Sequence, residues 1–158
     1  MGVSGSKLPR PDASFYVRLP GLPERAGAGA VVLRRAGAGW EVAVVVEPDG
    51  ERQLPKGGVE AGETHLDALY RELLEEAGLR EVVVADLGVQ ERQNYARTRW
   101  QVTQYFLGVT AAEAVTPLEP GFSLEWHPLD AAPELFWPEQ TRLVEEVRRG
   151  LAAGRWTL

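Results

Sequence analysis

The chain has 158 residues, of which 44% are hydrophobic and 25% are charged, a composition typical of one soluble globular domain rather than of a disordered chain. It contains no cysteine, which excludes a disulfide scaffold, a thiolate metal site and a cysteine nucleophile. The 23 acidic and 17 basic residues give a net charge of −6, and an acidic surface repels nucleic acid on average. We therefore expect a cytoplasmic protein that neither spans a membrane nor binds duplex nucleic acid.

The first part of the chain predicts a tail and then strands. Residues 1–26 are rich in proline and glycine, and we predict that they form an N-terminal extension of a single domain spanning residues 27–158. Two runs of β-branched residues, 30–35 and 40–47, are separated by glycines and predict a β-hairpin. A short strand near residues 53–54 is expected to lead into the glycine-rich loop LPKGGVEAGE.

The sequence marks one helix clearly, over residues 65–77. Thr64 predicts its N-cap, Asp67 completes a capping box, and Gly78 stands where a helix prefers a left-handed terminator. These signals predict both ends of the helix from local chemistry alone.

Further strands and a second helix follow. We predict strands over residues 81–91, 99–110 and 123–129, and Pro138 is expected to open an amphipathic helix. The order of strands, helix, strands and helix predicts an α+β fold rather than regular βαβ winding.

Three glutamates share one face of the first helix. Glu72, Glu75 and Glu76 are spaced i, i+3 and i+4, so their carboxylates lie close together. A divalent cation would turn their mutual repulsion into binding, because Mg²⁺ and Mn²⁺ favour oxygen ligands. The alternative is an ordinary solvated acidic face.

The loop before this helix favours a ligand site over a solvated face. Gly57 and Gly58 lack side chains, so their backbone groups can approach a ligand closely. Lys56 precedes them and offers a compact positive charge to a phosphate. We therefore predict that Lys56, Gly57 and Gly58 bind substrate.

The loop and the helix together carry one long motif. Its defining residues are Gly57, Glu63, Arg71, Glu72, Leu73, Glu75, Glu76, Gly78 and Leu79. The pattern resembles the Nudix box at every defining position, a match far rarer by chance than a short motif. The resemblance implies an α/β/α Nudix sandwich with a mixed sheet, which uses Mg²⁺ or Mn²⁺ to hydrolyse a nucleoside diphosphate linked to another group.

The resemblance also implies roles for the box glutamates. Glu72 and Glu76 would be metal ligands, with Glu75 a third ligand or the base that activates water. The base can instead come from a later loop, where Glu119 and Glu125 are the candidates. The catalytic residues are therefore predicted to be Glu75 and Glu76.

Two more box residues are expected to support the site. Arg71 and Glu63 would pair to hold the loop against the helix and so fix the ligands.

Substrate choice depends on residues outside the box. The form LPKGGVEAGE resembles the loop of Nudix enzymes that act on diadenosine polyphosphates and diphosphoinositol polyphosphates. Arg25, Arg97 and Arg99, with Arg92, lie near the expected active face and suit a highly charged substrate, although exposed arginines on a turn are often only solubilising. Five aromatic residues either stack on an adenine or, more commonly in strands, belong to the core: Tyr95, Trp100, Trp126, Phe136 and Trp137.

The most direct reading is a Mg²⁺-dependent Nudix hydrolase of dinucleoside polyphosphates or similar compounds, acting as a monomer or homodimer. The alternatives are a pyrophosphatase of oxidised nucleoside triphosphates, nucleotide sugars or capped RNA, and a non-catalytic nucleotide sensor. Residues 57–79 carry six acids and one base, so most of the net negative charge lies in the box. The acidity therefore indicates a metal site and does not argue against a phosphate ligand.

Overall fold

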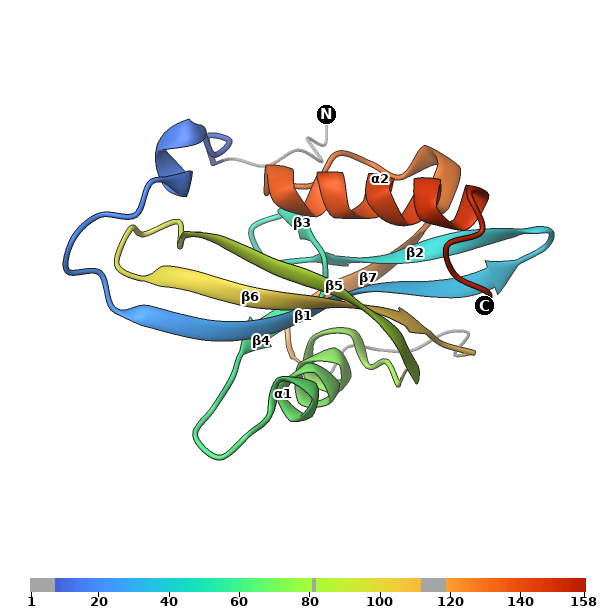
Figure 1. The fold of residues 1–158 in the computed structure, drawn as a ribbon, viewed down its shortest axis with the longest axis horizontal. Coiled ribbons are helices and arrows are strands. Elements are labelled where there is room, and N and C mark those ends of the chain that lie inside the picture. Colours follow the sequence, from blue (N-terminus) through green and yellow to red (C-terminus); the bar gives the residue numbers. More distant parts are fainter. Residues whose placement is uncertain (1–7, 81, 112–118) are drawn as a thin grey trace.

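The computed structural model describes residues 8–80, 82–111 and 119–158 and places one mixed β-sheet between two helices. Figure 1 shows α1 below the sheet and α2 above it. Within the described residues the sheet has seven strands: β1 (Glu24–Ala36), β2 (Gly39–Val46), β3 (Arg52–Gln53), β4 (Lys56–Gly58), β5 (Val82–Gln93), β6 (Trp100–Val109) and β7 (Ser123–Pro128). The helical elements are η1 (Ala13–Tyr16), α1 (His65–Glu72), η2 (Leu73–Ala77), η3 (Leu129–Ala131) and α2 (Pro138–Ala152). The predicted α+β sandwich with a mixed sheet is confirmed.

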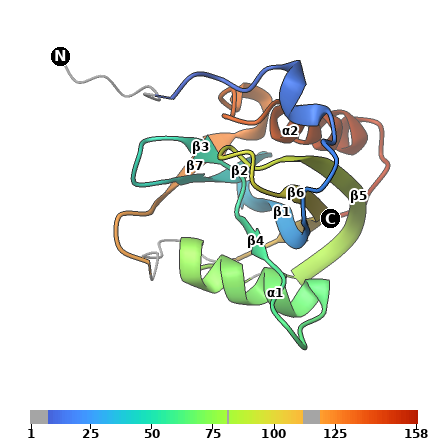
Figure 2. The ribbon, with the colours of Figure 1, turned by 90° about the vertical axis from the view of Figure 1, so that its left-hand side faces the viewer.

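The strand order brings the glycine-rich loop to the middle of the sheet. The main path is β3-β2-β1-β6-β5, with β4 paired to β1 and β7 paired to β2. β1 and β6 run parallel, and the other pairs are antiparallel. Since Gly58 of β4 lies opposite Gly27 of β1, the loop that follows β4 leaves from the sheet centre and leads to α1, as Figure 2 shows.

β1 begins earlier than the sequence predicts. Residues 24–29 contain alanine and glycine but no β-branched residue, so they carry no local strand signal. They become a strand because β6 pairs with them on one side and β4 pairs with Gly27 to Gly29 on the other. The sheet therefore includes residues 24–26, before the expected start of the domain.

The first helix has the predicted ends but a different last turn. Thr64 Oγ1 accepts a hydrogen bond from the Asp67 backbone at 3.1 Å, and Asp67 Oδ2 accepts one from the Thr64 backbone at 3.0 Å. Gly78 ends the helical segment with a left-handed φ of 64°. The last five residues, η2, form a π-helical turn, which holds more residues than an α-turn.

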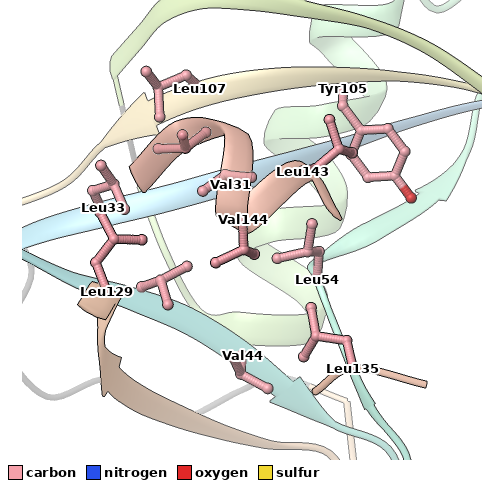
Figure 3. Packing of buried hydrophobic residues seen from close by; sticks show 12 residues of the cluster. Val31, Leu33, Val44, Leu54, Tyr105, Leu107, Leu129, Leu135, Leu143 and Val144 are labelled. Carbon is pink, nitrogen blue, oxygen red and sulfur yellow. The ribbon is translucent and has the colours of Figure 1, made fainter. Parts of the chain in front are cut away.

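Both faces of the sheet are covered by apolar side chains. Figure 3 shows Leu143 and Val144 of α2 packed over Val31, Val44 and Tyr105 of the sheet. A second cluster on the opposite face is formed by alanine, valine and leucine side chains of the sheet with α1 and η2. The central strands are therefore buried on both sides and give the site a rigid support. In the part of the chain that the structure describes, every helix is too short or too polar to cross a membrane.

A segment before β1, residues 8–23, folds back over one end of the sheet, and we call it the N-terminal strap. Its Phe15 ring stacks on Tyr95 with ring centroids 5.5 Å apart and meets Trp137 edge-on at 5.6 Å. Phe136 completes this cluster. Phe136 and Trp137 are therefore buried in the core, and Tyr95 packs against them and against Phe15.

Candidate active site

Three carboxylates meet beside the loop and the first helix. Glu72 ends α1, Glu75 lies in η2, and Glu119 comes from the segment before β7. The Glu119 backbone N–H donates to the Glu75 carbonyl at 2.9 Å, which ties that segment to the helix. One carboxylate oxygen from each residue lies within 4.8 Å of the other two. We call these residues the three-carboxylate group, and their spacing suits one cation with hard oxygen ligands.

Glu125, the other candidate base, lies elsewhere. Its carboxylate accepts hydrogen bonds from Arg52 at 2.8 and 3.3 Å, and His127 Nε2 lies 2.8 Å from it. The hydrogen bonds from Arg52 hold the pKa of Glu125 below its usual value of 4.5. Glu125 of β7 thus forms an ion pair with Arg52, the residue that opens β3, and His127 lies within hydrogen-bond distance of the same carboxylate.

Glu76 lies deeper than the three-carboxylate group. Its Oε1 accepts a hydrogen bond of 3.2 Å from the Lys56 backbone N–H. Burial raises the pKa of Glu76 to about 8, and Lys56 only partly opposes this increase. Burial likewise raises the pKa of Glu72, against the effect of Arg71. A nearby cation would favour the charged form of both carboxyl groups.

Arg71 connects the loop to the helix. Its Nε donates to Glu63 Oε2 at 2.7 Å, and its Nη2 donates to Glu63 Oε1 and to the Gly58 carbonyl at 2.9 Å. Its Nη1 reaches Glu72 Oε1 at 2.7 Å and Glu75 Oε2 at 3.3 Å. Hydrogen bonding to Arg71 lowers the pKa of Glu63 to about 2. One guanidinium therefore fixes the loop and orients two members of the three-carboxylate group.

The two box glycines make room for charged side chains of the protein itself. A Cβ atom on Gly57 would lie 2.0 Å from Cδ of Glu72, and one on Gly58 would lie 2.0 Å from Nη2 of Arg25. Arg25, on β1, therefore lies directly against the loop. Neither glycine has a positive φ, so the backbone conformation does not require glycine at these positions. Glycine is needed because the side chains of Glu72 and Arg25 approach so closely.

The arginines of the turn between β5 and β6 are placed differently from one another. Arg97 has a φ of 58°, donates to Ser14 Oγ at 2.8 Å, and holds its Cζ 3.9 Å from the centre of the Phe15 ring. Arg99 is exposed. The structure therefore joins Arg97 to the N-terminal strap and leaves Arg99 at the surface.

Arg92 is buried, and its partner is a residue that the sequence did not single out. Its Nε donates to Glu139 Oε2 at 2.6 Å, and its Cζ lies 3.4 Å from the centre of the Trp137 ring. Tyr16 of the strap donates to the other oxygen of Glu139. No local signal predicts this network, because its members come from three segments that are far apart in the sequence.

Comparisons with known proteins agree with this architecture. Residues 23–147 match the model of the NUDIX domain. An RNA pyrophosphohydrolase of Rhizobium meliloti is 34% identical over 154 residues, covering 80% of this chain and 92% of the relative. Among solved structures, an Ap4A hydrolase of C. elegans superposes with a TM-score of 0.71 at 20% identity, covering 82% of this chain and 98% of the other. A MutT NUDIX hydrolase of Burkholderia pseudomallei gives 0.66 at 25% identity, covering 78% and 98%.

The sheet, the helix bearing the glutamates and the relatives together define a hydrolase of pyrophosphate bonds. The chain belongs to the Nudix family, whose hydrolases generally use a divalent metal. The predicted family and enzyme class are confirmed.

Proposed function

We propose that this protein hydrolyses, with Mg²⁺, a phosphoanhydride bond at the 5′-polyphosphate end of an RNA. The observation that carries the proposal is the match to an RNA pyrophosphohydrolase along 92% of the relative's length. The internal linkages of RNA are phosphodiesters, so its phosphoanhydride bonds occur at a 5′ end with two or more phosphates. We propose that the protein meets this substrate in the cytoplasm.

The three-carboxylate group fits a divalent cation. Carboxylate oxygens are the ligands that Mg²⁺ and Mn²⁺ prefer, and Mg²⁺ commonly joins one or two carboxylates to substrate phosphates. We propose Glu72 and Glu75 of this group as ligands, together with the deeper Glu76, and Glu119 lies beside Glu72 and Glu75. A bound cation supplies charge stabilisation to the phosphates at the reacting centre.

Side chains of the protein would accept the proton of the attacking water and hold the carboxylates in place. A carboxylate near the scissile bond must accept the proton of the attacking water, and Glu75 and Glu119 are both partly exposed and adjacent. Glu119 supports the alternative of a base from a later loop, whereas Glu125 is occupied by Arg52. Arg71 keeps Glu72 and Glu75 in place throughout.

Among the predicted substrate-binding arginines, Arg25 contacts the glycine-rich loop. Its guanidinium lies over Gly58, and the side chain is half-buried. Arg25 pairs in register with Gln101, and Arg99 lies two residues earlier, in the turn just before β6. We propose that Arg25 binds the 5′ phosphates and Arg99 binds a phosphate further along. Arg97 would shape the turn that carries Arg99.

A second candidate substrate is a dinucleoside polyphosphate. The loop LPKGGVEAGE favours it, and the compound carries the same nucleoside 5′-polyphosphate unit as the RNA end. The same residues would bind both, so only turnover can rank them.

A substrate panel tests the proposal. The protein is incubated with Mg²⁺ and, at equal concentrations, a 5′-triphosphorylated oligoribonucleotide, diadenosine tetraphosphate, 8-oxo-dGTP and ADP-ribose, and products are separated by ion exchange. We expect the highest kcat/KM with the 5′-triphosphorylated RNA and no turnover of the 5′-monophosphorylated RNA. A tenfold preference for diadenosine tetraphosphate would favour the second candidate. Binding without turnover of any compound would reject both candidate substrates and indicate a nucleotide sensor. Glu75→Gln protein serves as the control for contaminating phosphatases.

A further inference from the structure

Two side chains, one from each helical layer, hold the backbone that joins β3 to β4. Leu54 and Pro55 form this connection, and Lys56 opens β4. Pro55 has no backbone N–H, so the donors on either side of it are those of Leu54 and Lys56. Leu54 donates to Oε1 of Gln140 at 2.9 Å, and Lys56 donates to Oε1 of Glu76 at 3.2 Å. Gln140 belongs to α2 and Glu76 to η2, so the two hydrogen bonds reach residues 54–56 from opposite faces of the sheet.

Gln140 is fully buried, and both ends of its amide have partners. Its exposed fraction is 0%, and its Nε2 donates to the Tyr105 hydroxyl at 3.1 Å. A backbone N–H can only donate, so Oε1 of Gln140 must face Leu54 and Nε2 must face Tyr105. The Tyr105 ring packs closely on Gly29, where an added Cβ would lie 2.7 Å from it. The two partners therefore give the Gln140 amide one orientation.

A polar residue at this place in α2 needs an explanation. The neighbouring buried side chains on the same helix are apolar: Leu143, Val144 and Val147. Leu54 lies in the same cluster, which Figure 3 shows, and is 1% exposed. A buried amide is unfavourable unless it forms hydrogen bonds, and so is a buried backbone N–H. Gln140 therefore satisfies a donor of the connection that water does not reach.

The connection can pass a displacement on to the candidate site. Pro55 fixes its own φ and restricts the conformation of Leu54 before it, so residues 54–56 are stiff. A shift of Leu54 would therefore move Lys56, whose N–H holds Glu76. It would also move Gly57, which lies against a carboxylate of the three-carboxylate group.

We propose that Gln140 is a positioning residue, which anchors residues 54–56 to α2 and so orients Glu76 and the glycine-rich loop at the cation site. This inference rests on the cation site proposed above. Gln140 acts through the Leu54 backbone, from the face of the sheet that α2 covers.

Amide hydrogen exchange followed by NMR tests the anchor without cation or substrate. We expect the Leu54 amide of the wild-type protein to be protected like the amides of the β1–β6 pair. Tyr105→Phe is the matched control, since it removes one buried hydrogen bond of Gln140 and keeps the bond to Leu54. In Gln140→Met the amides of Leu54 and Lys56 should exchange about tenfold faster than in Tyr105→Phe. An unprotected Leu54 amide in the wild-type protein, or equal exchange at Lys56 in the two variants, would overturn the proposal.

Kinetics and Mn²⁺ binding separate positioning from a purely structural role. With the substrate that the panel ranks first, we expect Gln140→Met to lower kcat and Mn²⁺ affinity about tenfold. Tyr105→Phe should keep both within about threefold of wild type. Gln140→Glu should do the same, because its carboxyl group accepts from Leu54 and can accept from the Tyr105 hydroxyl. Circular dichroism confirms folding, and urea unfolding measures the loss of stability in each variant.

The outcomes distinguish this inference from the proposed function. A folded Gln140→Met protein with wild-type kcat and Mn²⁺ affinity would show that Gln140 is only structural, and equal losses in Tyr105→Phe would also contradict positioning. If Gln140→Met does not fold, Leu54 exchange in the wild-type protein and the activity of Gln140→Glu decide. If the wild-type protein cleaves no compound of the panel, the proposed function fails, whereas the exchange rates still test the anchor.

Discussion

Replacing Gly57 with alanine is a sharp test of the site, because a single methyl group reaches the carboxylate of Glu72, a proposed metal ligand. The added Cβ would lie 2.0 Å from Cδ of Glu72, and ordinary contact begins at 3.4 Å, so the carboxylate must move by about 1.4 Å. The φ of Gly57 is not positive, so alanine fits the backbone there. The steric clash can therefore be relieved by movement of the flexible Glu72 side chain, without a change in the fold.

The size of the effect follows from this displacement. A misplacement of about 1 Å at a reacting centre costs on the order of 100-fold in rate. A side chain that leaves its preferred rotamer costs about 1 kcal/mol. We therefore expect Gly57→Ala to lower kcat about 100-fold and to weaken cation binding, while the free energy of unfolding changes by about 1 kcal/mol or less.

Steady-state kinetics, Mn²⁺ binding and urea unfolding measure the three quantities. Gly39→Ala is the matched control, since its Cβ would meet its nearest neighbour at 3.9 Å in the β1–β2 hairpin, and it should behave as wild type. Gly58→Ala should instead raise KM, because its Cβ displaces Arg25. If Gly57→Ala keeps kcat and Mn²⁺ affinity within threefold of wild type, Glu72 is not a metal ligand in the observed position.

Three further predictions concern charged side chains. Glu119→Gln should lower kcat at least tenfold, whereas Glu125→Gln should lower the melting temperature and leave kcat unchanged, and equal kinetic losses would contradict the difference in their positions. The pKa of Glu63 falls from 4.5 to about 2 on folding, so its pair with Arg71 stabilises the protein fully above about pH 4.5 and progressively less as the pH falls toward 2. Urea unfolding across that range should show a weaker pH dependence in Glu63→Gln, and an unchanged slope would refute the assignment. Glu139→Ala leaves a buried guanidinium unpaired and should cost about 3–5 kcal/mol of unfolding free energy, and a loss below about 1 kcal/mol would show that the pair is unimportant for stability.

Local signals in the sequence predict local structure well. The capping box at Thr64 and the terminator at Gly78 are short-range chemistry, and both ends of the helical segment lie where they indicate. The π-helical turn before Gly78 has no such signal and was not predicted. The start of β1 was also missed, since its first residues are strand only because β6 and β4 pair with them.

The candidate site likewise contains some contacts that the sequence predicts and others that it does not. The spacing of Glu72 and Glu75 places both on one helix face, and the structure brings their carboxylates together. Glu119 joins them through a backbone hydrogen bond to Glu75, a long-range contact that the sequence offers only as one of two candidates. We therefore propose Glu119 rather than Glu125 as the base from a later loop, since Arg52 forms hydrogen bonds with the carboxylate of Glu125.

The directions of long side chains are least predictable from sequence. Lys56 and Arg97 carry the charge that suits a phosphate, but their stems are flexible and tertiary contacts decide where they point. The Lys56 side chain leaves β4 on the face of the sheet that carries Tyr105, and Arg97 donates a hydrogen bond to Ser14 of the strap. The sequence shows that positively charged side chains are available near the site. Tertiary packing determines that Arg25 lies against the glycine-rich loop.

The most direct test of the central claim is the cation dependence of turnover with a 5′-triphosphorylated oligoribonucleotide. We expect no release of phosphate or pyrophosphate in EDTA, saturable release with Mg²⁺, and a loss of at least 100-fold in Glu72→Gln protein that folds like wild type. Turnover that is unchanged in EDTA, or a Glu72→Gln variant with wild-type activity, would contradict the claim that these carboxylates hold the catalytic cation.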